Sequence, residues 1–126
     1  MKLSTYLSVG GIVAMLFGLA FLLVPEYAGK QYGVPTEPHN LMQARYFGAT
    51  LLPYGLILWL ARDTHDDTAL RAILQSAVVI NVLGAGISVW AGLAGLQNAM
   101  VWGSVAIYAL LLLGAVYFLA YRARQA

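Results

Sequence analysis

The sequence predicts an all-α integral membrane protein: four helices cross the bilayer as an up-down-up-down bundle, with the N and C termini in the cytoplasm. Three observations predict this fold. The 126 residues are 61% hydrophobic and 10% charged, whereas soluble domains average about 45–50% and about 25%. The apolar residues fall into four long runs, and most basic residues gather on one side of them. A soluble domain of this size keeps much of its surface in water, so it could not hide so many apolar side chains.

Each apolar run is close to the roughly 20 residues that cross a ~30 Å hydrocarbon core. The predicted spans form a single domain over residues 1–126 and cover residues 7–24, 41–61, 70–95 and 98–121. The hydrocarbon core offers no water to backbone polar groups, so these groups must pair within helices. The runs do not alternate in polarity as the strands of a membrane β-barrel would.

The first run begins like a secretory signal, because Lys2 precedes an apolar stretch. Residues 7–24 exceed the usual length of a signal core, which is about 7–15 residues. Pro25 and Glu26 follow the run, where a signal would have a small-residue cleavage site. We therefore expect an uncleaved membrane anchor.

The polar residues between the runs predict the helix ends. Pro25 ends the first span, and residues 25–39 are expected to form an ordered interfacial loop. Asn40 is a good N-cap for the second span, with Gln43 three residues later as in a capping box. Residues 63–68 form a polar turn before the third span.

The basic residues predict the orientation. One side carries five of them, namely Lys2, Arg62, Arg71, Arg122 and Arg124, and the other carries two, Lys30 and Arg45. Cytoplasmic loops are enriched in lysine and arginine, which places both termini in the cytoplasm.

Small residues recur at helical spacing in two of the spans. The candidate helix-packing positions are Gly10, Ala14 and Gly18 in the first span, and Gly84, Ser88 and Gly92 in the third. Small residues let helix backbones approach closely, so we expect these faces to pack against other helices of the bundle. The alternative is a face that packs against another membrane protein or a second copy of the chain.

Arg45 is the one basic residue more than a turn inside a predicted span. We expect it to act as an interfacial anchor that reaches the outer headgroups. Alternatively, it pairs with Glu26 or Glu37 of the outer loop, or binds an anionic lipid or substrate.

A second candidate ligand site lies near the membrane midplane, where Asn81, Tyr54 and Tyr108 fall at similar depths. Polar groups at this depth are costly unless they form hydrogen bonds. We expect these three side chains to form hydrogen bonds between helices. Alternatively, they line a small pocket that binds a lipophilic ligand.

The sequence offers no catalytic residue, metal site or cofactor site. Cysteine is absent, and the two histidines, His39 and His65, fall on opposite sides of the predicted membrane. His65 lies in an acidic turn that we expect to be solvated rather than metal-bound. A net charge of +2 without a basic cluster does not favour binding to nucleic acid.

Three short motifs suggest a family. They are residues 45–49 (RYFGA), residues 58–62 (LWLAR) and residues 22–25 (LLVP). With them the chain resembles small four-helix bacterial inner-membrane proteins that share a domain of unknown function. A fainter similarity is to the four-helix scaffold proteins of sterol biosynthesis, which tether membrane enzymes. The resemblance implies fold and location, and carries over no catalytic residue.

These observations together favour a non-enzymatic membrane protein, either an accessory or scaffold subunit or a homo-oligomer. Its expected partners are membrane lipids and either another membrane protein or a second copy. The alternative is a binder or carrier of a small lipophilic molecule.

Overall fold

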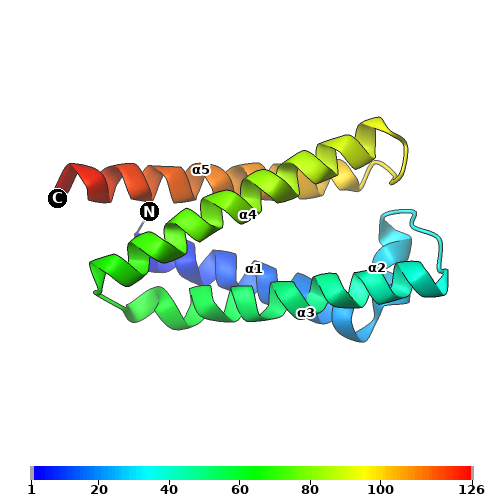
Figure 1. The fold of residues 1–126 in the computed structure, drawn as a ribbon, viewed down its shortest axis with the longest axis horizontal. Coiled ribbons are helices and arrows are strands. Elements are labelled where there is room, and N and C mark those ends of the chain that lie inside the picture. The colour runs from blue at the N-terminus through cyan, green and yellow to red at the C-terminus, as the bar shows by residue number, and fades with distance from the viewer. Residues whose placement is uncertain (1, 126) are drawn as a thin grey trace. The chain divides into compact units, whose positions relative to one another are not determined.

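A computed structural model describes residues 2–125, and within that range the chain is helical with no strand (Figure 1). The elements are α1 (Leu3–Leu23), α2 (Pro25–Gln31), α3 (Pro38–Leu60), the short 3-10 helix η1 (Ala61–Asp63), α4 (Asp67–Leu93) and α5 (Val101–Gln125). The predicted all-α class is confirmed. The side chains of Arg122 and Arg124, which the orientation prediction used, lie outside the described part.

The chain divides into two compact units. The α1–α3 unit contains the residues up to Asp63 together with Leu96–Asn98, and the α4–α5 unit contains Thr64–Gly95 and the residues from Ala99 onward. Each unit is described by itself below.

The first part of the connection after α1 is a helix, and only residues 32–37 form a loop. Pro25 ends α1 and also begins α2, since its fixed φ and missing N–H suit the first position of a helix. At the other end of α2, Gly33 has a φ of +73°. The N–H of Gly33 donates to the Lys30 carbonyl, and the N–H of Val34 donates to the Gly29 carbonyl, both at 3.0 Å. This pair of bonds is the Schellman motif, which explains why a glycine stands there.

The predicted N-cap of the second span is wrong. α3 begins two residues before Asn40, with Pro38 in its first turn and Glu37 at the N-cap position. Asn40 lies inside the first turn, and its Nδ2 donates to the Pro35 carbonyl at 2.9 Å. Asn40 therefore holds the incoming loop against the helix instead of capping it.

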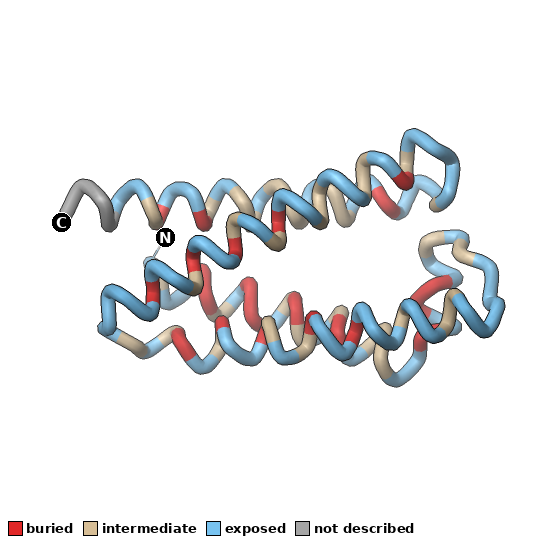
Figure 2. The backbone as a smooth tube through the Cα atoms, in the orientation of Figure 1, coloured by how far each residue is buried: buried red, intermediate tan, exposed pale blue. Residues whose placement is uncertain are grey.

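α1 and α3 pack antiparallel along a seam of four glycines and one alanine, which we call the glycine seam: Gly11, Ala14 and Gly18 of α1, and Gly48 and Gly55 of α3. A Cβ on Gly55 would lie 2.7 Å from the Met15 nitrogen and 2.8 Å from the Gly11 oxygen. Figure 2 shows buried positions recurring along both helices. The backbones thus meet at a distance that only glycine permits at these positions.

The glycine seam repeats every seven residues. Gly11 and Gly18 are seven apart on α1, and so are Gly48 and Gly55 on α3. A seven-residue repeat keeps the same faces together when two helices wind around each other with a left-handed twist. Gly10, which the sequence favoured, is also buried, but the seam passes through Gly11.

In the α4–α5 unit, glycines of α4 receive aromatic rings of α5. A Cβ on Gly84 would overlap the ring of Tyr108, and one on Gly92 would lie 2.8 Å from Cζ2 of Trp102. Ser88, between these two glycines, is half-buried. The contact therefore joins backbone to aromatic side chain, whereas the glycine seam joins backbone to backbone.

Both ends of α4 are defined by local chemistry. The Asp66 carboxylate accepts a hydrogen bond from the Ala69 N–H at 3.1 Å, as an N-cap does. Because of this cap, α4 begins at Asp67, three residues earlier than predicted. At the other end, Gly95 has a φ of +72° and turns the chain out of the helix.

The segment between α4 and α5 caps α2. The Asn98 N–H donates to the Tyr32 carbonyl at 2.9 Å, and its side-chain Nδ2 donates to the Gln31 carbonyl at 3.0 Å. The last carbonyls of a helix have no partner within the helix. Asn98 was predicted to begin the fourth span, but it satisfies two such carbonyls of α2, and α5 begins at Val101.

Three of the described helices are long and apolar enough to cross a membrane: α1, α4 and the Val101–Tyr121 part of α5. The chain thus has the features of an integral membrane protein. α3 is long enough, but Gln43, Arg45 and Pro53 reduce its mean hydropathy, and it is not among the three.

Candidate functional site

The α1–α3 unit has an open hollow where the end of α1 meets the first half of α3. We call it the Arg45 hollow. Its volume is about 300 Å³, and its lining residues are Leu22, Pro38, Met42, Arg45, Tyr46 and Ala49. The five residues from α3 follow the spacing of one helical face, and Leu22 closes the hollow from the last turn of α1. The hollow is therefore an apolar trough with one cationic group.

Arg45 is exposed and has no carboxylate partner within the part of the chain that the structure describes. The two acidic residues proposed for it do not pair with it. Glu26 instead forms a salt bridge of 3.6 Å with Lys30, four residues later on α2. Glu37 stands at the N-cap position of α3 and forms no salt bridge with Arg45. The positive charge of Arg45 is thus available to a group from outside the chain.

The midplane candidate Asn81 is buried, with 3% of its surface exposed. Its Nδ2 donates to the Ala77 carbonyl of its own helix at 2.7 Å. Among the described residues, no buried side-chain nitrogen or oxygen lacks a hydrogen-bond partner. One of the two amide donors of Asn81 is thus satisfied by its own helix.

The two tyrosines proposed to lie beside Asn81 belong to different units. Tyr108 is half-buried, and its ring packs on Gly84, one helical turn from Asn81. Tyr54 is half-buried on α3, within the α1–α3 unit. Tyr108 therefore lies close to Asn81 within the α4–α5 unit. Tyr54 belongs to the α1–α3 unit and is described within that unit only.

The two histidines and the acidic residues of the turn at 63–68 belong to different elements of the fold. His39 is exposed in the first turn of α3, and His65 is exposed just before α4. Asp66 caps α4, and Asp63 lies 3.7 Å from Arg62 in a salt bridge. Within the described residues, no three of the histidine, aspartate and glutamate side chains are grouped to hold a metal ion.

Sequence reasoning found Arg45 but missed most of the hollow around it. Leu22, Met42 and Ala49 are ordinary apolar residues, and only the packing of α1 on α3 places them together. The spacing of Met42, Arg45 and Ala49 on one helical face was a signal that could have been used. Nothing in the sequence predicted that Leu22 would line the hollow.

Comparison with models of protein families, with curated proteins and with solved structures gives no match for this chain. The resemblance to small four-helix bacterial inner-membrane proteins therefore stays a prediction.

Proposed function

We propose that this chain is a four-span protein of the bacterial inner membrane that acts without catalysis, as an accessory or scaffold subunit or as a homo-oligomer. The observation that carries this proposal is an exposed apolar face on α4. Leu83, Ile87 and Trp90 are 59%, 64% and 62% exposed and recur at helical spacing. In a bilayer such a face is compatible with lipid or with a partner helix.

The fourth span in this proposal is α3, and its packing on α1 supports it. Gly11 lies against Gly55, Gly18 lies against Leu52, and Gly48 lies against the last turn of α1. These contacts extend along the length of α1, so a bilayer that contains α1 also contains most of α3. Arg45 lies near the outer end of α3, where its side chain can extend to the headgroups.

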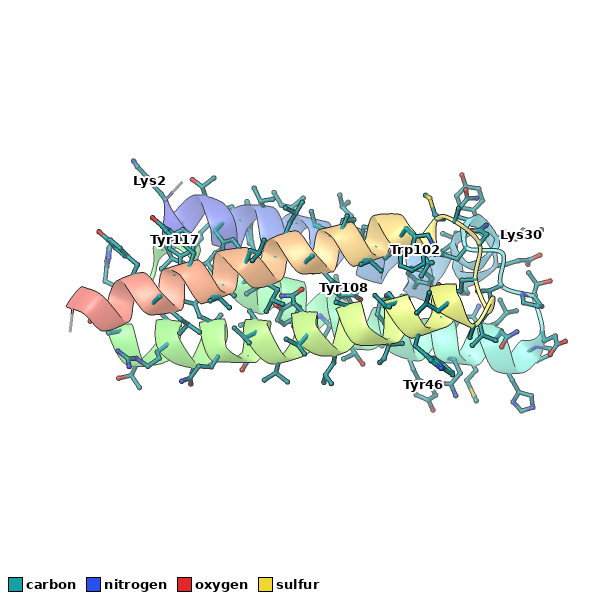
Figure 3. All side chains as sticks on the ribbon, turned by 90° about the horizontal axis from the view of Figure 1, so that it is seen from above. Lys2, Lys30, Tyr46, Trp102, Tyr108 and Tyr117 are labelled. Atoms are coloured by element: carbon teal, nitrogen blue, oxygen red, sulfur yellow. The ribbon has the colours of Figure 1, made fainter. Side chains whose placement is uncertain are left out.

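Charged and aromatic residues toward the ends of the units support the proposed spans. Lys2 and Lys30 lie at opposite ends of the α1–α3 unit (Figure 3). Lys2 shares its end with Arg62, since the start of α1 packs beside the end of α3. In the α4–α5 unit, Trp102 lies at the start of α5, and Tyr117 lies well along the helix toward its other end (Figure 3). Tryptophan and tyrosine favour the two membrane interfaces, and basic residues favour the cytoplasmic side.

Gly86 is the residue of α4 at which we expect a helix of another chain to pack. It lies on the exposed face of α4, and a Cβ on it would have nothing within 4 Å. The other glycines of α4, Gly84 and Gly92, are already covered by aromatic rings of α5. Gly86 therefore leaves room for the close approach of a helix from another chain.

Native mass spectrometry of the protein extracted from membranes in polymer-bounded discs tests this proposal. We expect a second copy or another membrane protein at defined stoichiometry. Gly86→Phe should abolish that complex and leave thermal unfolding unchanged, because the added ring enters open space. Gly103→Phe is the matched control, since Gly103 of α5 is equally open. A mass of one chain with lipid alone would contradict the proposal.

The second candidate function is the binding of a small lipophilic molecule near Asn81. The observation that favours it is the burial of an amide in an apolar helix. Against it stands the hydrogen bond from Asn81 to Ala77, which satisfies one of the amide donors without a ligand.

A further inference from the structure

The Arg45 hollow combines features that suit an amphiphile. Its cationic group stands beside the apolar side chains of Leu22, Met42 and Ala49, which line the same trough. Tyr46 adds a residue with a hydroxyl group to the lining. Figure 3 shows Tyr46 nearer to the Lys30 end of the α1–α3 unit than to the Lys2 end. A ligand that fits must offer an anion and a hydrocarbon chain at one membrane interface.

The proposed depth of Arg45 favours binding of a counter-ion. It stands seven residues after Pro38, which is about 10 Å along the helix axis at 1.5 Å per residue. A guanidinium at the edge of the hydrocarbon core is costly unless an anion or water neutralises it. The described residues supply no such anion, since Glu26 is paired with Lys30.

The phosphate of a lipid headgroup is available at this depth. A guanidinium is planar and can donate two parallel hydrogen bonds to one phosphate. A free phosphate would use Arg45 and Tyr46 but would leave the apolar side of the trough open. The apolar lining therefore favours a lipid over a soluble anion.

We propose that the Arg45 hollow binds one anionic phospholipid, with its phosphate on the Arg45 guanidinium and an acyl chain along Leu22, Met42 and Ala49. This inference rests on the proposed membrane span of α3. Thiol labelling of cysteines at either end of α3 tests that span separately, so failure of the span and failure of the lipid site are distinguishable.

The test uses the full chain reconstituted in nanodiscs that contain equal amounts of phosphatidylglycerol and phosphatidylcholine. Native mass spectrometry then measures which lipid stays bound. Wild type should retain one phosphatidylglycerol in preference to phosphatidylcholine. Arg45→Gln should reduce this preference by about tenfold or more, as expected for the loss of a charged hydrogen bond. Lys30→Gln is the matched control on the same side and should keep the preference.

A second variant tests the acyl-chain half of the site. Ala49→Phe fills the hollow and leaves Arg45 in place, so it should also reduce phosphatidylglycerol retention. Ala49 and Arg45 are both exposed, and circular dichroism should show unchanged helix content in both variants. Wild-type retention in Arg45→Gln would overturn the proposal. Displacement of the lipid by glycerol 3-phosphate at equal concentration, or wild-type retention in Ala49→Phe, would overturn the assignment to a lipid.

Discussion

The glycine seam makes a sharp prediction at Gly55. A methyl group added there would lie 2.7 Å from the Met15 nitrogen, 2.8 Å from the Gly11 oxygen and 2.9 Å from the Ala14 Cβ. Two of these three atoms belong to the backbone of α1, so rotation of a side chain cannot relieve the clash. Gly55→Ala therefore requires α1 and α3 to move apart.

The expected cost follows from two opposing effects. A separation of about 0.5 Å already forfeits roughly a quarter of the dispersion energy of each contact, and overpacked cores lose typically about 1–3 kcal/mol. Alanine regains up to about 1 kcal/mol of helix propensity relative to glycine. We therefore expect Gly55→Ala to lower the free energy of unfolding by about 1–2 kcal/mol.

The assay is unfolding by sodium dodecyl sulfate in mixed micelles, followed by tryptophan fluorescence. Gly103→Ala is the control, because Gly103 is helical and a Cβ on it would meet nothing within 4 Å. This control should unfold at the wild-type midpoint or later, since it gains helix propensity without a clash. If Gly55→Ala unfolds no earlier than Gly103→Ala, the close approach of α1 and α3 is refuted.

The remaining predictions concern topology and the midplane. In intact cells, a membrane-impermeant thiol reagent should label Thr36→Cys and not His65→Cys, on an otherwise cysteine-free chain; the opposite pattern would reverse the orientation. Asn81→Leu should change stability by less than about 1 kcal/mol, because membrane hydrogen bonds of this kind contribute about 0.6 kcal/mol. Bound lipids, measured by mass spectrometry, should also be unchanged in Asn81→Leu; loss of a co-purifying small molecule would instead support the pocket.

The long helices were predictable because the hydrophobic runs are nearly uninterrupted. α2 was not, because Pro25 was interpreted only as the end of a helix. The same residue suits the first turn of a new one. The early start of α4 was also missed, since it depends on the Asp66 side chain and not on hydropathy.

The sequence pointed to a packing face on α1 that overlaps the glycine seam, since Gly10, Ala14 and Gly18 are all buried. Gly10, Ala14 and Gly18 recur every fourth residue, whereas the glycine seam uses Gly11, Ala14 and Gly18. Which of the neighbouring glycines Gly10 and Gly11 meets α3 depends on how the two helices pack. That packing depends on the partner helix, so a single stretch of sequence does not contain it.

The Arg45 hollow was predictable in part, because the charge of Arg45 stands out in an apolar run. Its shape depends on how far α3 slides along α1. That register is set by Gly48 against the last turn of α1 and by Gly55 against Gly11. The spacing of residues along one helix does not reveal how far a second helix is shifted along it.

The hydrogen bonds of Asn98 set an order of events during synthesis. The glycine seam needs only residues that are made early, from Gly11 to Gly55. The carbonyls of Gln31 and Tyr32 receive their donors from a residue 67 positions after Gln31. Contacts so distant in sequence form late, because a long loop must close first. The end of the α1–α3 unit that carries Gln31 and Tyr32 is therefore completed only after α4 and Asn98 have been translated.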